Sequence, residues 1–554
     1  MDDELEHAFE RNPHLKEHYY NFIDEVGDPP EFLVSLSRDL GKIKYPNILY
    51  PVGDPIFVHI YGDENEGTVK YIGIEPRLDD KGEKKYLRVM DAILERAPNE
   101  PIPNTEDELK ETILKLLDES VTIEGETIEE AGREGRKSVI SSILGGSIGE
   151  KIRLTPEEYD TIHYLIVRNI IGSGPLEPVI RDPYLEDIHS IGVESVFIVH
   201  KIFGMMQTNI TFGTRAALDD WLRSMSERIG RPVSESTPIA DGALPDGSRI
   251  NIIYSDDVSR RGSSFTMRKF ADIPVSIIQL INWGAIDVNL AAYMWICLEN
   301  GMSIFFSGET ASGKTTMLNA CLPFVNRKHK IYSVEDTAEV QPPHAVWQQL
   351  ITREQGPPES HVDMFTLLKA ALRSRPNYII AGEIRGVEGA VAFQAMQTGH
   401  PVLATFHASA VKKMIQRLTG DPINVPVTFI DNLNIAMILQ AVYRKGDFLR
   451  RCISVEEIEG YYEEAGGVVT RAVFQWDPAS DVHHFRGLNN SFILENKIAD
   501  KLGYEDKREI YEDLFLRARI LQRMREEGIE EYYDVLKVIW EFQEKGIDGL
   551  SIPI

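Results

Sequence analysis

Cysteine is scarce in this sequence. Only Cys297, Cys321 and Cys452 occur among 554 residues, and they lie far apart along the chain. Their number is odd and none of them forms a C-x-x-C pair, which argues against a disulfide framework and against a four-cysteine zinc site. We therefore expect a reducing, cytoplasmic location and no metal bound by cysteine.

An excess of positive charge is also missing. Lysine and arginine number 59 against 87 aspartate and glutamate residues, which gives a formal net charge of −28. Sequence-independent binding to nucleic acid requires a basic surface, and adsorption to an anionic membrane requires a basic patch. Neither kind of binding is expected for a chain with this balance of charge.

Long hydrophobic runs are absent as well. The most apolar stretch, residues 290–306, contains Glu299 and Asn300, so it is not an uninterrupted membrane span. The first residues, MDDELEHAFERNPHLKEHYYNF, are acidic and lack the basic and apolar regions of a signal peptide. We expect any association with a membrane to depend on partner proteins.

Ordinary fractions of apolar (43%) and charged (26%) residues indicate a folded chain, and its length indicates several domains. We expect an irregular and helical region over 1–150, an α/β domain over 151–272, a second α/β domain over 273–455, and a β-meander with helices over 456–554. The run Leu144-Gly-Gly-Ser-Ile-Gly149 predicts a flexible boundary after the first region.

Local patterns predict several elements within these regions. Capping-box spacings predict helices that begin after Thr105 and Thr155. Residues 195–200 and 208–212 are expected to be strands. In the third region, short apolar strands alternate with helical segments, at residues 303–307, 331–334, 378–381 and 402–406. Such alternation predicts a parallel sheet covered by helices on both faces.

The segment Gly308-Glu-Thr-Ala-Ser-Gly313-Lys314-Thr315 fits the phosphate-loop pattern G-x-x-x-x-G-K-[ST], between an apolar strand and a helix-forming run. Its glycines allow backbone N–H groups to surround phosphate oxygens. Lys314 adds positive charge, and the Thr315 hydroxyl is placed to bind Mg²⁺. We expect nucleotide-binding residues at Gly308, Glu309, Thr310, Ala311, Ser312, Gly313, Lys314, Thr315 and Thr316.

Polar side chains follow three other predicted strands. Glu335 ends the strand at 331–334, Glu383 follows 378–381, and His407 follows 402–406. Carboxylates at the C-terminal edge of a parallel sheet lie where ligands bind in open α/β folds. They suit an attacking water or the water shell of a metal ion, and His407 is a candidate sensor of the γ-phosphate.

Four segments together resemble the type II/IV secretion ATPase superfamily: GETASGKTT, SVEDTAE, LLKAALRSRPNYIIAGEIRG and TGHPVLATFHAS. Residues 417–434, 450–461 and 474–487 are similar to its archaeal branch, most of all to the motor ATPases of the archaellum. The resemblance implies a C-terminal RecA-like core with a parallel sheet, preceded by a smaller α/β domain. It also implies an ATP hydrolase that requires Mg²⁺ and acts as a homo-hexamer.

The resemblance extends to individual residues. It implies that Thr315 and Glu383 contact the metal, and it assigns catalytic positions to Glu335, Glu383, His407, Arg249, Arg268 and Arg373. The implied partners are a polytopic membrane platform protein and accessory cytoplasmic motor proteins. The chain would then be cytoplasmic and peripheral at the inner face of the cell membrane.

Three alternatives stay open. An archaeal type IV pilus or type II-like secretion ATPase would share these motifs. A RecA-like nucleic-acid translocase is opposed by the net charge of −28. A scaffold that binds ATP without hydrolysing it is opposed by the presence of Lys314, Glu335 and Glu383.

Overall fold

The computed structural model describes residues 3–103, 105–124, 151–244, 246–270, 273–353, 358–444, 447–464 and 466–554. These residues form two compact units, Met1–Phe270 and Ala271–Ile554, and each has its own sheet and core. The flexible boundary expected at 144–149 lies outside the described residues. Within the described ranges, no helix is both long and apolar enough to cross a membrane.

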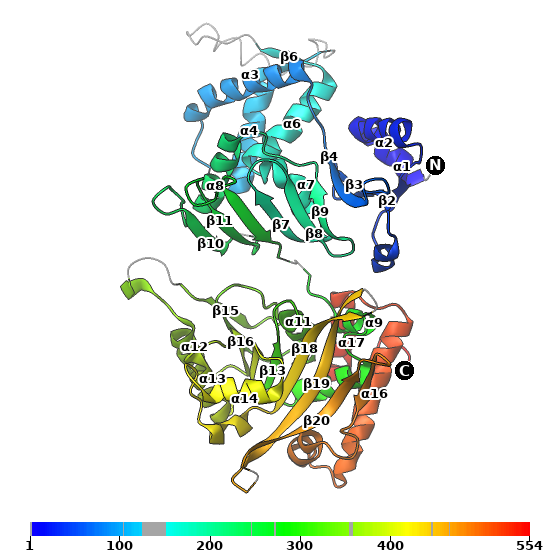
Figure 1. Ribbon diagram of the computed structural model, residues 1–554, viewed down its shortest axis with the longest axis vertical. Coiled ribbons are helices and arrows are strands. Elements are labelled where there is room, and N and C mark those ends of the chain that lie inside the picture. The colour runs from blue at the N-terminus through cyan, green and yellow to red at the C-terminus, as the bar shows by residue number, and fades with distance from the viewer. Residues whose placement is uncertain are drawn as a thin grey trace. The chain divides into compact units, whose positions relative to one another are not determined.

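The N-terminal unit is built on a sheet of ten strands among the described residues (Figure 1). The strand order across the sheet is β1 (Glu31–Phe32), β2 (Asn47–Pro51), β3 (Phe57–Asp63), β4 (Thr68–Ile74), β9 (Gly204–Thr208), β8 (Val196–His200), β7 (Leu185–Ile191), β12 (Ser264–Arg268), β11 (Arg249–Ile253) and β10 (Ile239–Ala243). The β1–β2 and β4–β9 pairs are parallel and the others antiparallel.

This sheet corrects the expectation of an irregular and helical region over 1–150. That region supplies β1 to β4, and β4 pairs with β9 through Tyr71 and Thr208, so one sheet crosses the expected border at 150. Runs such as Phe57-Val-His-Ile-Tyr61 are rich in aromatic and β-branched residues, which favour strands. The strand expected at 208–212 also lies earlier, because β9 forms a hairpin with β8 and ends at Thr208.

The N-terminal unit also contains helices, and the two capping predictions are confirmed. The Thr105 hydroxyl accepts a hydrogen bond from the Glu108 N–H, and Thr155 forms a complete capping box with Glu158. The helices are α1 (Asp3–Arg11), α2 (Pro13–Val26), α3 (Asp80–Arg96), α4 (Glu106–Ser120), α6 (Pro156–Ile170), α7 (Glu177–Arg181) and α8 (Arg215–Arg228), and a parallel strand pair joins β5 (Val121–Ile123) to β6 (Ile152–Leu154).

A buried carboxylate ties the early strands to the later ones. Asp182 Oδ2 accepts hydrogen bonds from Tyr50 on β2 (2.6 Å) and Tyr71 on β4 (3.1 Å). Its Oδ1 accepts the Tyr184 N–H, at 2.8 Å. Asp182, Tyr50 and Tyr71 are all 0% exposed. Burial raises the pKa of Asp182, and the hydrogen bond from Tyr50 opposes that rise.

The C-terminal unit has a sheet of nine strands among the described residues. Its order is β15 (Trp347–Ile351), β14 (Ile331–Glu335), β16 (Tyr378–Glu383), β17 (Val402–Phe406), β13 (Ile304–Gly308), β18 (Ile435–Arg444), β19 (Asp447–Tyr462), β20 (Gly467–Asp477) and β21 (Val482–Phe485). The pairings from β15 to β18 are parallel, and those from β18 to β21 are antiparallel.

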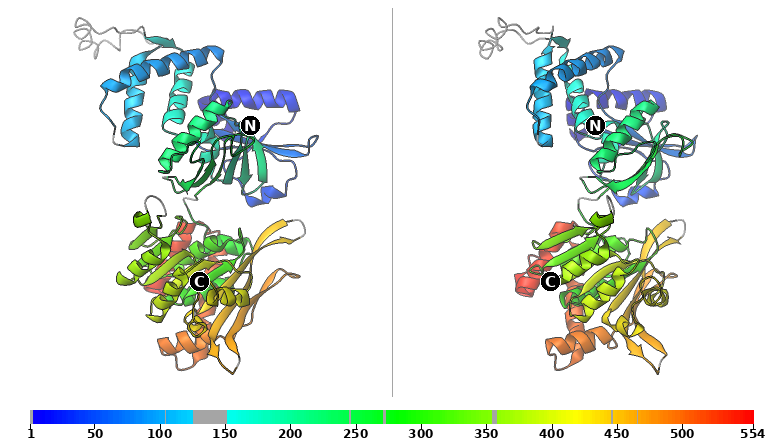
Figure 2. Two further views of the ribbon diagram at one scale, coloured as in Figure 1. Left: turned by 60° about the vertical axis from the view of Figure 1, so that its left-hand side comes forward. Right: turned by 90° about the vertical axis from the view of Figure 1, so that its left-hand side faces the viewer.

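The predicted parallel sheet and its four strands are confirmed by β13, β14, β16 and β17. The expected border at 455 lies inside β19, because the meander extends the same sheet instead of starting a separate one. Figure 2 shows these long strands in yellow and orange continuing from the parallel part.

Helices cover both faces of the parallel strands. Ile304 and Phe306 face one buried cluster, whereas Phe305, between them, faces the other. The first cluster includes α9 (Ile277–Asn282), α10 (Val288–Glu299), α11 (Lys314–Cys321), α16 (Ile510–Glu526) and α17 (Tyr532–Lys545); the second includes α12 (Met364–Arg373), α13 (Glu388–Gln397) and α14 (Val411–Thr419). The apolar stretch at 290–306 supplies α10, whose residues 290–298 are all buried, and then β13.

The Asp182 network predicts a measurable stability cost. Asp182→Ala removes the nearest acceptor of the buried Tyr50 and Tyr71 hydroxyls, so we expect it to lower the free energy of unfolding of the N-terminal unit by about 2–4 kcal/mol. Calorimetry of the full chain measures the shift. Asp39→Ala, which removes only the exposed ion pair with Lys42, serves as control and should shift it little. Equal stability of the two variants would contradict the assigned role.

Candidate nucleotide site

The phosphate loop connects β13 to α11. Gly308 is required at the start of the loop, because a Cβ there would lie 2.2 Å from the Leu439 carbonyl oxygen and 2.5 Å from Ser312 Oγ. Ala311 and Gly313 have positive φ angles of 61° and 86°, which fold the loop back before α11 begins at Lys314. The residues predicted to bind nucleotide, 308–316, thus form one loop and the first turn of a helix.

Polar side chains hold this loop from inside. Ser312 Oγ and Lys314 Nζ both donate to the Glu309 carbonyl oxygen, at 2.7 and 2.9 Å. Burial lowers the pKa of Lys314, while the charges of Glu383 and Glu339 oppose that shift. Carboxylates near the ammonium group therefore help to keep it charged. A charged lysine at a helix N-terminus suits phosphate oxygens.

Glu383 and His407 meet at the carboxyl edge of β16 and β17. His407 Nε2 lies 3.0 Å from Glu383 Oε1, and the Arg385 guanidinium donates to Glu383 Oε2 at 2.6 Å. Burial raises the pKa of Glu383, but Arg385, His407 and Lys314 together bring it below its ordinary value. Burial and the nearby Lys314 charge lower the pKa of His407. The site therefore favours an ionised carboxylate beside a neutral imidazole.

A bulge in β16 places Glu383. Register with β17 passes from Ala381–Ala404 to Glu383–Thr405, so Gly382 is skipped. A Cβ on Gly382 would approach Glu335 Cγ to 3.0 Å, which makes glycine the residue that fits between the two acidic strand ends. The bulge turns Glu383 toward His407.

Glu335, the predicted catalytic glutamate, is 1% exposed at the end of β14. Its Oε2 accepts the N–H groups of Glu339 (2.7 Å) and Val340 (2.8 Å), and its Oε1 accepts from Gln349 Nε2 (3.1 Å). Burial raises its pKa, and these hydrogen bonds oppose the rise. The carboxylate thus holds the turn that follows β14.

That turn presents a residue absent from the predicted set. Glu339 is exposed, and its Oε2 accepts the Thr315 hydroxyl hydrogen at 3.1 Å. The motif SVEDTAE contains both glutamates, and spacing alone did not separate them. A signal was available: Glu339 lies beyond the strand end, where the chain reaches the edge of the sheet, whereas Glu335 is still within the strand.

Arg373 is not brought to this edge within the chain. It ends α12, before β16 begins at Tyr378, and the next residue, Ser374, accepts a hydrogen bond through its carbonyl from Lys330, just before β14 (3.0 Å). Arg373 therefore lies near the amino ends of the parallel strands, opposite the phosphate loop.

Arg249 and Arg268 lie in the N-terminal unit, where they are cross-strand partners on β11 and β12. Arg249 forms an ion pair with Asp241 (3.0 Å), and Arg268 with Asp187 (3.2 Å). Their side chains are 48% and 61% exposed. The two predicted arginines therefore lie opposite each other on adjacent strands.

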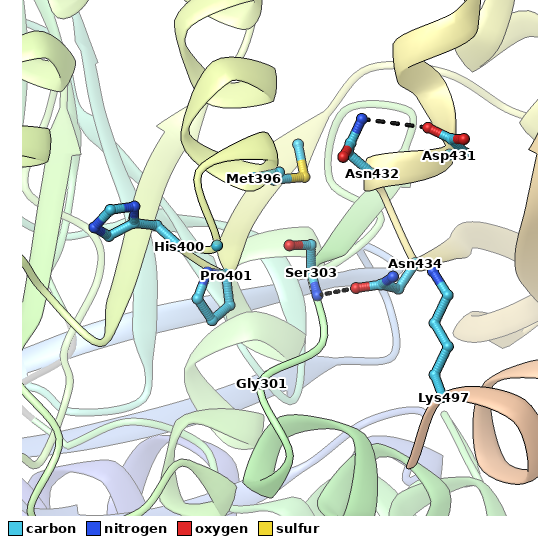
Figure 3. A pocket seen from close by; sticks show the side chains of 10 residues that line it. Gly301, Ser303, Met396, His400, Pro401, Asp431, Asn432, Asn434 and Lys497 are labelled. Carbon is cyan, nitrogen blue, oxygen red and sulfur yellow. Dashed lines mark hydrogen bonds between the residues drawn. The ribbon is translucent and has the colours of Figure 1, made fainter. Parts of the chain in front are cut away.

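A separate cavity of about 220 Å³ lies at the amino ends of β13, β17 and β18 (Figure 3). Ser303, His400 and Asn434 line it, and Lys497 extends toward Asn434. These residues precede the strands whose other ends carry Gly308 and His407. The cavity is therefore at the far edge of the sheet from the phosphate loop, and it contains none of the predicted site residues.

Comparison with known proteins identifies the family. Residues 170–467 match the family model described as type II/IV secretion system protein, and the chain belongs to that family. The uncharacterized protein MJ0900 of Methanocaldococcus jannaschii is 58% identical over 552 residues, which cover 100% of this chain and 98% of that protein. The predicted superfamily and fold class are thus confirmed.

More distant similarities are also found. A putative conjugal transfer protein of Mycobacterium tuberculosis is 29% identical over 248 residues, covering 43% of this chain and 70% of that protein. The crystal structure of the ATPase DotB of Legionella pneumophila shares 17% identity, covers 67% of this chain and 90% of that chain, and has a TM-score of 0.37.

The loop geometry predicts the effect of removing its charge. Lys314→Ala should weaken Mg-ATP binding by at least about tenfold, because the loop loses its own cation. Isothermal titration calorimetry measures the affinity. The exposed Lys328, outside the loop, gives a matched control in Lys328→Ala. Wild-type affinity in Lys314→Ala would rule out the assigned site.

Proposed function

We propose that this protein is an ATP hydrolase that depends on Mg²⁺. The observation that carries the proposal is the meeting of three features at one sheet edge: a phosphate loop, the Thr315–Glu339 hydrogen bond, and the Glu383–His407 pair. Membership of the type II/IV secretion system protein family supports it.

The donor atoms at this edge fit Mg²⁺. Thr315 offers a hydroxyl oxygen, and Glu339 and Glu383 offer carboxylate oxygens, which are the ligands that Mg²⁺ prefers. We assign Thr315 and Glu383 as the residues that would hold it, directly or through water. When bound with ATP, Mg²⁺ compensates charge on the β- and γ-phosphates.

The chain's own residues supply the remaining steps. Lys314 places positive charge against the phosphates. His407, neutral near pH 7 because burial and Lys314 lower its pKa, donates its Nε2–H to Glu383 and orients that carboxylate. Glu339, exposed beside Thr315, is the carboxylate positioned to accept a proton from the attacking water. Glu335 acts through the turn that it holds, as a positioning residue.

The two glutamates can be separated by experiment. Glu339→Gln should bind Mg-ATP with near wild-type affinity but hydrolyse it at least about 100-fold more slowly, because an amide does not accept the proton. Glu335→Gln should lose less than about tenfold, since its amide oxygen can still accept the Glu339 and Val340 N–H groups. Steady-state phosphate release and nucleotide titration give both quantities.

Thermal stability completes this comparison. Glu335→Ala should lower the melting temperature of the C-terminal unit, because it removes the acceptor of the Glu339 and Val340 N–H groups, whereas Glu339→Ala should not. If Glu335→Gln is the slower enzyme and remains as stable as the wild type, Glu335 is the proton acceptor after all.

We further propose that the chain acts as a homo-hexamer whose domain motion follows ATP hydrolysis. An arginine from a separate element contributes roughly 10³–10⁵ in rate to many phosphate-loop enzymes. Arg249 and Arg268, paired on β11 and β12, are the candidates, reaching the nucleotide of their own or of the adjacent subunit.

Mixed assemblies test this arrangement. Arg268→Ala and Lys314→Ala should each be nearly inactive alone and should partly restore activity when co-assembled, because some sites then combine an intact loop with an intact arginine. Phosphate release from the mixture is the readout. Arg215→Ala, which removes another exposed ion pair of the same unit, should keep its activity alone. A mixture no more active than its components would place Arg268 outside the neighbouring site.

We propose that the machine driven by this ATPase is the archaellum, and that hydrolysis powers its assembly and rotation. The force would pass through a polytopic membrane platform protein, with accessory cytoplasmic motor proteins as further partners. The supporting observation is the similarity of residues 417–434 and 450–461 to that branch. The chain would be cytoplasmic and peripheral at the inner membrane face. An archaeal pilus or secretion ATPase would use the same site, and cross-linking that captures the platform protein distinguishes these machines.

A further inference from the structure

The β18–β19 hairpin extends beyond the phosphate loop. Gly308, the last residue of β13, pairs with Leu439 of β18. Beyond Leu439, the two strands continue to pair with each other as far as Arg444 and Asp447. Figure 1 shows β18 and β19 as long neighbouring arrows next to β13. This hairpin therefore adds surface beside the loop that the parallel strands do not provide.

One face of that hairpin continues the core face that contains α11. Leu439 and Cys452, which are register partners, are buried in the same cluster as Met317 and Leu318 of α11. Side chains alternate along strands, so the pairs Ala441–Arg450 and Tyr443–Phe448 lie on the same face, further out. The outer pairs therefore stand on the α11 side of the sheet, level with the phosphate loop and beyond it.

Direct contacts join this face to the loop. Arg450 Nε donates to the Ala311 carbonyl oxygen at 2.9 Å, and its Cδ lies 3.4 Å from the Cβ position of Gly313. The guanidinium carbon lies 5.4 Å from the centre of the Phe448 ring, which is itself 5.2 Å from the Tyr443 ring. The phosphate loop, the Arg450 guanidinium, the Phe448 ring and the Tyr443 ring therefore form a continuous series of contacts.

The two rings are open to solvent. Tyr443 is 80% exposed and Phe448 46% exposed. Exposed aromatic rings forgo the favourable free energy of burial. A pair of them beside a phosphate-binding loop therefore suggests a ligand with a flat ring that can stack on them.

The orientation of a bound triphosphate points to the same side. The acidic side chains and His407 follow β14, β16 and β17, which lie on one side of β13 in the sheet, and they mark the γ-phosphate end. The β18–β19 hairpin lies on the other side of β13. Because the phosphates form a chain, the nucleoside at its opposite end is directed toward the hairpin.

We propose that Phe448 and Tyr443 form a stacking surface for the purine base of the bound nucleotide, linked to the phosphate loop by Arg450. The inference rests on the proposed function, since it requires the phosphates to occupy the 308–316 loop. It adds the part of the site that recognises the base, which the loop and its acidic residues leave undefined.

Two ligands separate base recognition from phosphate recognition. Isothermal titration calorimetry of the full chain with Mg-ADP and with Mg-tripolyphosphate, which has no base, compares the variants. Phe448→Ala and Tyr443→Ala should each weaken Mg-ADP binding by about tenfold, in line with the contribution of one base–aromatic stack. Both should keep Mg-tripolyphosphate affinity within about twofold. Phe448→Tyr retains a ring and should keep wild-type affinity for both.

Tyr462→Ala provides the matched control. Tyr462 is an aromatic residue of the same strand, 48% exposed, at the opposite end of β19, and its removal should change neither affinity. Unchanged Mg-ADP affinity in the Tyr443→Ala, Phe448→Ala double variant would overturn the stacking surface, and so would an equal loss for both ligands. A change in hexamer formation at unchanged Mg-ADP affinity would instead make the pair a subunit contact and also overturn the proposal.

The same titrations keep this proposal distinct from the proposed function. If the wild-type chain binds neither ligand, the nucleotide site itself is wrong. If the wild type binds both ligands and the double variant does so equally well, only the stacking surface is wrong.

Discussion

Parallel pairing of β13, β14, β16 and β17 is the constraint on which the site depends. Because these strands run in one direction, their carboxyl ends share an edge, and the residues that follow them, otherwise far apart in the sequence, meet there. The apolar strands must be buried on both faces for this sheet to form, which the two clusters of helices achieve. The packing that buries these strands is therefore also what brings the site residues together.

Concentrating acidic groups at one edge has an electrostatic cost that the structure offsets locally. At Glu335, hydrogen bonds from two backbone N–H groups and Gln349 oppose the rise in pKa that burial causes. At Glu383, the neighbouring Arg385 and His407 help to bring the pKa below its ordinary value. Glu339 alone is left exposed beside Thr315. Glu335 and Glu383 are thus engaged by hydrogen bonds and cations, whereas the third carboxylate is open to solvent.

The strands β13, β14, β16 and β17 could be predicted from the sequence, because each is a short apolar run next to a helical pattern, and the phosphate loop is local. Contacts between residues that are far apart in the sequence could not be predicted. Arg450 and Ala311 are 139 residues apart, and their contact depends on the register of β18 with β13. The early strands of the N-terminal unit have a local signal, in runs such as Phe57-Val-His-Ile-Tyr61, but the pairing of β4 with β9 depends on tertiary contacts. Choosing between Glu335 and Glu339, which belong to one motif, requires knowing where β14 ends.

The roles proposed for these residues all depend on hydrolysis of ATP at this sheet edge with the help of Mg²⁺. The most direct test is phosphate release from ATP by the purified full-length chain, measured with Mg²⁺ and again after its removal by a chelator. We expect phosphate release with Mg²⁺, its loss when the metal is removed, and its return when Mg²⁺ is added back. Binding of Mg-ATP with no phosphate release under any of these conditions would contradict it.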